Sequence, residues 1–160
     1  MRKEILLVLD KDADRPIVNL PEHVGLTALL DTGARFPVWA ADLRPLIALG
    51  AKLFKSNVSY SGIGGETKGD IYKIPSLVIG EKTNGLLFPE LPVITNKDFD
   101  DAPFAMILSA TMFHNLEYTI SDKRHTLTIR VPDDESDVRN AIVKTDEDFQ
   151  VLFTGSNAGL

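Results

Sequence analysis

The chain has 160 residues, of which 44% are hydrophobic and 25% charged, a length and balance that suit one soluble domain with its own core. Its net charge of −6, from 17 basic and 23 acidic residues, argues against nucleic acid as a partner. The lack of cysteine excludes disulfides, zinc–thiolate sites and thiol nucleophiles. No apolar run approaches the roughly 18 residues of a membrane span, so we expect a cytoplasmic protein with no membrane partner.

Short extended segments bounded by turn residues predominate along the chain. The first three predicted strands lie at 4–10, 15–20 and 25–31. Residues 51–80 predict two strands joined by a glycine-rich turn, because Gly62, Gly64 and Gly65 permit positive φ. Residues 118–131 predict another hairpin. Many short strands without a long helical period indicate an all-β barrel or sandwich.

Two short helices are also predicted. The first, within 41–50, has Asp42 as its cap and Gly50 as its stop. Its apolar face is expected to hold Leu43, Leu46 and Ile47. The second, within 109–118, has Ser109 as a possible cap. Its apolar residues are Met112, Phe113 and Leu116.

Beyond Pro132 the sequence becomes acidic and polar before two short strand-like runs. We therefore divide the chain into a main domain, 1–132, and a C-terminal extension, 133–160. The extension is either a terminal hairpin or partly disordered.

The most informative tripeptide is Asp31-Thr32-Gly33, which occurs once, at the end of an apolar run. Such a tripeptide arises by chance in roughly a few per cent of chains of this size, and Asp and Gly favour turns. Two further features follow it in order. They are a glycine-rich hairpin tip at 61–69 and an apolar strand that breaks into a short helix at 105–113.

These segments, "ALLDTGA", "GIGG" and "MILSATMF", together resemble the retropepsin-like aspartic proteases, the single-lobe relatives of pepsin. The resemblance spans about residues 3–131, and its third motif matches in pattern only. Ser109 stands where the family usually has Gly, Ala110 where retroviral members commonly have Arg, and Arg35 where they tend to carry an acid. The resemblance implies an all-β acid-protease barrel with one or two short helices, active as a C2 homodimer.

The resemblance also implies an aspartic endopeptidase in which Asp31 acts once from each subunit. Two adjacent carboxylates share one proton, so one activates a water and the other hydrogen-bonds the scissile carbonyl. Thr32 would brace the paired loops and Gly33 would donate its N–H to the carboxylate. An extended peptide or protein would be the substrate, bound by Ala34, Arg35, Tyr60, Gly62, Ile63, Gly64 and Gly65. Residues 61–69 would form a flap over it.

No cofactor is implied, and the three histidines show no metal-ligand spacing, so no metal site is expected. The extension at 133–160 would add strands at the dimer interface or be removed by self-processing. One alternative function is a catalytically silent dimerisation or peptide-binding module on the same fold. Another is an unrelated β-barrel that carries the tripeptide by chance.

Overall fold

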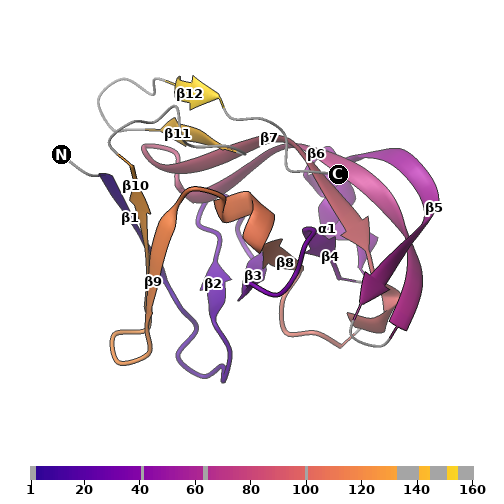
Figure 1. Ribbon diagram of the computed structural model, residues 1–160, viewed down its shortest axis with the longest axis horizontal. Helices are drawn as coiled ribbons and strands as arrows, with labels where there is room; N and C mark the ends of the chain where they lie inside the picture. Colours follow the sequence, from indigo (N-terminus) through magenta and orange to yellow (C-terminus); the bar gives the residue numbers. More distant parts are fainter. Residues whose placement is uncertain are drawn as a thin grey trace.

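The structure, a computed structural model, describes residues 3–40, 42–62, 65–99, 101–132, 141–144 and 151–154. It is mostly β, as the sequence predicts (Figure 1). Within these ranges no helix is long and apolar enough to cross a membrane. The strands are β1 Lys3–Val8, β2 Ile17–Asn19, β3 Thr27–Asp31, β4 Val38–Trp39, β5 Lys52–Gly62, β6 Gly65–Glu81, β7 Asn84–Thr95, β8 Met106–Ser109, β9 Glu117–Ser121, β10 Thr126–Val131, β11 Ile142–Lys144 and β12 Val151–Thr154. The helical segments are α1 Leu43–Ala48, η1 Lys97–Phe99 and η2 Ala110–Phe113.

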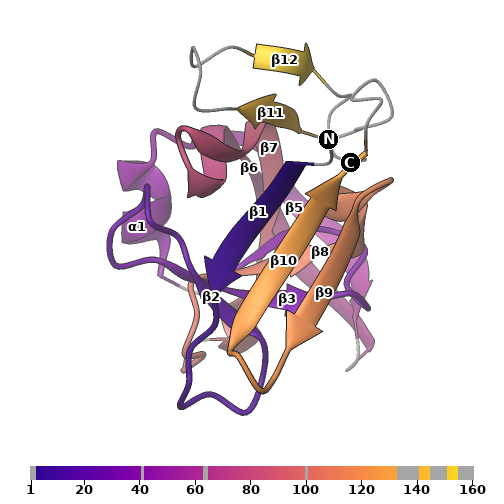
Figure 2. The ribbon, with the colours of Figure 1, turned by 90° about the vertical axis from the view of Figure 1, so that its left-hand side faces the viewer.

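The strands form two sheets. In the smaller sheet β10 lies between β1 and β9, and all its pairs are antiparallel (Figure 2). The larger sheet runs in the order β12-β11-β7-β4-β8-β3-β2, and the long strand β6 pairs with both β5 and β7. Most of its pairs are antiparallel, but β3 runs parallel to β8, and β4 runs parallel to β7. The strand that carries the Asp-Thr-Gly tripeptide is therefore an interior strand, with β2 on one side and β8 on the other.

The strand β3 is buried on both of its faces. Ala28 and Leu30 pack into the central cluster, which joins the inner faces of both sheets. Leu29, between them, packs into a second cluster on the opposite face. We call this the site-side cluster; its buried members are Ile17, Leu29, Val38, Ile71, Ile94, Phe104 and Ile107. A strand buried on both faces explains why the segment before Asp31 is continuously apolar.

The helix α1 begins where the sequence predicts, because the Asp42 carboxylate accepts the backbone N–H of Arg44. The predicted apolar face is only partly correct. Leu46 is fully buried, whereas Leu43 and Ile47 are exposed, with 36% and 53% of their surface accessible. A six-residue helix packs against the barrel through a single turn, so it brings one side chain into the core rather than three.

The second predicted helix is the short 3₁₀ segment η2. Met112 and Phe113 are buried in it, and Leu116 packs against the same central cluster. The predicted capping role of Ser109 is wrong, because its side chain makes no cap hydrogen bond. The Ser109 hydroxyl bonds instead to the hydroxyl of Thr111.

The two strand-like runs beyond Pro132 form β11 and β12, which pair with each other. β11 also pairs with β7, with Ile142 opposite Leu87 and Lys144 opposite Gly85. Figure 1 shows the two strands at one end of the molecule, beside the β7 edge. Ala141, just before β11, is fully buried in the central cluster. The strands that follow Pro132 therefore pack on the body of their own chain.

Candidate active site

Asp31 is the last residue of β3 and is half-buried. Because side chains alternate along a strand, Asp31 projects to the same face as Leu29, which is the face of the site-side cluster. The residue opposite Asp31 in the parallel pair with β8 is Ser109, which is fully buried. The carboxylate thus stands at the end of the interior strand β3, whose backbone pairs with β2 on one side and with β8 on the other.

The turn after Asp31 holds the carboxylate directly. The Gly33 N–H donates to Asp31 Oδ1 over 2.9 Å, as predicted for this glycine. The Ala34 N–H donates to the Asp31 carbonyl oxygen over 3.1 Å and closes the turn. A β-carbon at Gly33 would lie 3.3 Å from Asp31 Oδ1, which is tighter than ordinary contact. Glycine therefore suits this position because the backbone must approach the carboxylate closely.

Two hydrogen bonds between described residues attach the same turn to η2, and a third supports them from within the β8–η2 segment. The Ala110 N–H donates to the Ala34 carbonyl oxygen over 3.1 Å. The Thr111 hydroxyl donates to the Arg35 carbonyl oxygen over 3.0 Å, and it lies 2.8 Å from the Ser109 hydroxyl. The sequence analysis did not anticipate these links, since the residues of the two segments lie far apart in the chain.

The β5–β6 hairpin rises from the large sheet beside this turn. Its strands pair from Val58 opposite Gly69 to Gly62 opposite Gly65, so the predicted glycine-rich hairpin is confirmed. The predicted tip residues Ile63 and Gly64 lie outside the described residues.

Thr95, at the end of β7, anchors the base of the hairpin. Its hydroxyl accepts the Asp70 N–H over 2.9 Å, and its carbonyl oxygen accepts the Tyr60 hydroxyl over 3.3 Å. Tyr60 is half-buried and packs against the site-side cluster. Its burial, with a smaller contribution from the negative charge of Asp98, raises the pKa of the Tyr60 phenol. Tyr60 is therefore expected to remain a neutral hydrogen-bond donor over the whole physiological pH range.

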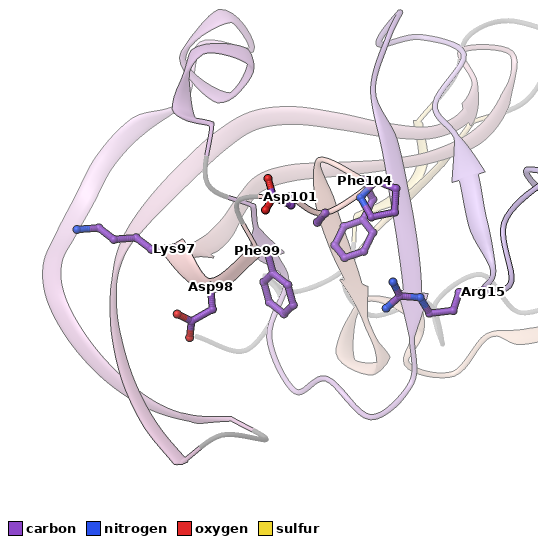
Figure 3. Close-up of a pocket in the computed structure, with 8 residues that line it drawn as sticks. Arg15, Lys97, Asp98, Phe99, Asp101 and Phe104 are labelled. Atoms are coloured by element: carbon purple, nitrogen blue, oxygen red, sulfur yellow. The ribbon is translucent and has the colours of Figure 1, made fainter.

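An open pocket of about 560 Å³ lies on the same side of the molecule. It is lined by Arg15, residues 97–99 and residues 101–104. Figure 3 shows the Phe99 and Phe104 rings next to each other, with the Arg15 side chain extending toward them. The ring centroids are 6.0 Å apart, and the Arg15 guanidinium carbon lies 5.8 Å from the centroid of the Phe104 ring. The pocket thus has aromatic walls and charged groups at its rim.

The site-side cluster connects the turn, the hairpin and the pocket. The half-buried residues that pack against it include Ala34 from the turn, Val58 and Tyr60 from the hairpin, and Phe99 from the pocket wall. The structure therefore places Asp31, Gly33, Ala34 and Tyr60 on one side of the molecule. Thr32 and Arg35 are exposed on the turn.

The pocket residues were not predicted from the sequence. Asp101 in this loop is exposed, whereas Asp100 lies outside the described residues. A usable signal was present, because Phe99 and Phe104 lie within a polar loop where large aromatic residues need a partner.

Among the described residues, no group of three or more histidine or acidic side chains is arranged to hold a metal ion. His23 has a different contact, since its Nε2 accepts the backbone N–H of Val78 over 3.0 Å. That bond requires a neutral imidazole.

No protein-family model matches the chain, and no curated protein matches it. Among solved structures, the chain is similar to the crystal structure of a retropepsin-like aspartic protease from Rickettsia conorii, with a TM-score of 0.48 and 19% sequence identity. The similarity covers 78% of this chain and 97% of that chain.

Proposed function

We propose that this chain is an aspartic endopeptidase that acts as a homodimer. Asp31 from each of two copies would form the catalytic pair, and an extended peptide would be the substrate. The observation that carries the proposal is the placement of Asp31. It stands half-buried at the end of an interior strand, and one carboxylate oxygen accepts the N–H of Gly33.

The position of Asp31 suits the proposed chemistry. A carboxylate on a strand end is held more precisely than one on a mobile loop, and it remains accessible to water and to a peptide. The Gly33 N–H fixes the direction of Asp31 Oδ1, and the ionised carboxylate of the pair would take a proton from the attacking water. The fully buried strand residues behind Asp31 resist displacement of its backbone.

The hairpin and the pocket suit an extended substrate. The hairpin strands end in backbone that a peptide can pair with by adding a strand. The aromatic walls of the pocket offer one substrate side chain an apolar contact, and Arg15 and Asp98 add charge at its rim. Binding energy from such remote contacts is what orients the scissile bond.

The second carboxylate must come from another copy because the tripeptide occurs once in the chain. Two carboxylates about 3 Å apart cannot both ionise, so the pair would retain one proton. A two-fold axis between the two Asp31 side chains would make the site from two identical halves.

The test compares wild type with Asp31→Asn in a diverse peptide library, between about pH 4 and 7. Asp122→Asn, in the exposed turn between β9 and β10, is the matched control. Wild type and the control are expected to cleave, whereas Asp31→Asn is expected to be folded and inactive. Peptidase activity in the Asp31→Asn protein at the wild-type level would contradict the proposal.

A mixing experiment tests the shared site. Once subunits have exchanged, an equal amount of Asp31→Asn should lower the activity of a fixed amount of wild type to about half, because mixed dimers hold one carboxylate. Adding Asp122→Asn should instead raise the total activity. If wild type cleaves no peptide in the library, the alternative of a catalytically silent module is favoured.

A further inference from the structure

The Ser109 hydroxyl is fully buried, yet it lies directly across the sheet from Asp31. A buried hydroxyl is costly unless it forms a hydrogen bond, and the bond that satisfies it runs to Thr111 over 2.8 Å. That bond leads to the turn that follows Asp31, because the Thr111 hydroxyl also contacts the Arg35 carbonyl oxygen.

The direction of these bonds follows from counting protons. A carbonyl oxygen can only accept, so the Thr111 hydroxyl must use its single proton on Arg35. The Ser109 hydroxyl must therefore donate its own proton to the Thr111 oxygen. The result is an ordered relay from Ser109 through Thr111 to the Arg35 carbonyl oxygen.

The relay acts on the turn together with two backbone bonds. The Ala110 N–H holds the Ala34 carbonyl oxygen, and the Ala34 N–H holds the Asp31 carbonyl oxygen. Consecutive carbonyl groups of the turn, at positions 34 and 35, are thus both fixed to η2. The Gly33 N–H, which precedes them, is consequently fixed in its direction toward Asp31 Oδ1.

We propose that Ser109 and Thr111 are positioning residues that aim the Gly33 N–H at the Asp31 carboxylate. The inference rests on the proposed function for its catalytic consequence. Both hydroxyls act through the backbone of residues 33–35. Loss of the relay would leave the turn with its backbone bonds alone, and the N–H would point at the carboxylate for a smaller fraction of the time.

The test compares two substitutions at one position in the full-length protein. Thr111→Val removes the hydroxyl at nearly constant shape, whereas Thr111→Ser keeps it. In Thr111→Val we expect faster hydrogen exchange at the Gly33 and Ala34 amides, measured by NMR. Thr111→Ser should restore both values to near those of wild type.

Where peptidase activity is measured, Thr111→Val should lower kcat about tenfold with KM changed less than about twofold, because orientation at the reacting group is lost while substrate binding is kept. Thr111→Ser should restore kcat to near the wild-type value. A merely structural role would lower the stability of Thr111→Val without lowering kcat and without a faster exchange confined to the Gly33 and Ala34 amides, and that result would overturn the inference.

Ser109→Ala provides an independent variant, and it also serves if Thr111→Val fails to fold. It removes the hydroxyl that donates to Thr111 but leaves the bond between Thr111 and Arg35. A smaller increase in the exchange rate of the Gly33 and Ala34 amides is therefore expected. Because the hydroxyls act in series, the double variant should change the amide exchange of Ala34 by less than the sum of the single effects. Additive effects would contradict a relay.

The two hypotheses can fail separately. If wild type cleaves no peptide, but Thr111→Val exposes the Ala34 amide and Thr111→Ser does not, the proposed function fails and the positioning role stands. If the protein is an active peptidase and Thr111→Val changes neither the amide exchange nor kcat, the positioning role fails and the proposed function stands.

Discussion

Gly69 passes so close to the carbonyl oxygen of Thr95 that a side chain at position 69 would collide with it. The atom in the way is a backbone oxygen, which cannot rotate away as a flexible side chain could. This contact lies where the β5–β6 hairpin leaves the support of β7, since the last β6–β7 pair on this side is Ile71 with Ile94. The close approach of Gly69 to Thr95 therefore sets how tightly the base of the hairpin is held.

Gly69→Ala is expected to push β6 away from β7 and to lower the free energy of unfolding by about 1–3 kcal/mol, the usual cost of overpacking. Urea unfolding of the wild type and the variant measures this change. Ser59→Ala, at an exposed position of the same hairpin, is the matched control and should be nearly neutral. Equal stability of the Gly69→Ala and Ser59→Ala proteins would show that the close approach does not constrain the hairpin.

The ionisation of Tyr60 offers a second prediction. Its pKa is raised above 10.0, first by burial and then by the Asp98 charge. Asp98→Asn removes the charge but not the burial, so the pKa should fall part of the way back. The measurement is ultraviolet titration of the phenols, with Tyr60→Phe identifying the contribution of Tyr60. A Tyr60 pKa that is unchanged in Asp98→Asn would mean that the two side chains do not interact.

A third prediction concerns stability below neutral pH. Burial lowers the pKa of His23 from 6.5, an effect that the neighbouring Glu22 partly opposes. In the unfolded chain His23 therefore takes up a proton at higher pH than in the folded protein. The stabilisation from the neutral imidazole is complete above about pH 6.5 and is lost as the pH falls through the lower folded pKa.

His23→Gln should reduce this pH dependence, because its amide oxygen can accept the Val78 N–H without titrating. Denaturant unfolding at a series of pH values tests this. His114→Gln, at an exposed position, is the control and should retain the wild-type slope. The same slope in His23→Gln as in wild type would exclude His23 as its source.

A fourth prediction rests on the proposed function. Phe99→Ala removes one aromatic wall of the pocket, so KM for peptides that place a large apolar side chain there should rise about tenfold, with kcat less affected. Profiling the peptide library with wild type and variant measures the change. Phe54→Ala is a suitable control, because Phe54 is 60% exposed on β5 and does not line the pocket. An unchanged preference in Phe99→Ala would place the substrate elsewhere.

Local sequence patterns predicted much of the strand content. The strands β1, β2 and β3 and the hairpins β5–β6 and β9–β10 match the predicted segments and extend beyond them by at most one residue, because alternation and turn residues are local signals. The strand β7 was not predicted; the turn that joins it to β6 is formed by Lys82 and Thr83, and the Asn-Gly pair that follows lies within the strand, opposite Glu81 and Gly80. The homodimer remains a prediction.

The site was predictable only in part, for a physical reason. Asp31 and Gly33 interact across two positions of the chain, so a short motif indicates the bond. The contacts of Tyr60 with Thr95 and of Thr111 with Arg35 join segments that meet only after the sheet has formed. No periodic pattern in a single sequence indicates that two such distant segments will come into contact. The aromatic pocket was missed although Phe99 and Phe104, two large aromatic residues in a polar loop, offered a local signal.

The position of β3 between β2 and β8 also determines when the site can exist. Its partner β2 comes shortly before it in the chain, but β8 and η2 come much later, with Thr111 lying 76 residues beyond Arg35. Contacts of such long sequence separation form late in folding, after the cost of closing the loop has been met. On the ribosome, the Asp31 turn therefore stays without its anchor until η2 has emerged. Any hydrolytic capacity would appear only in a chain whose barrel has already closed.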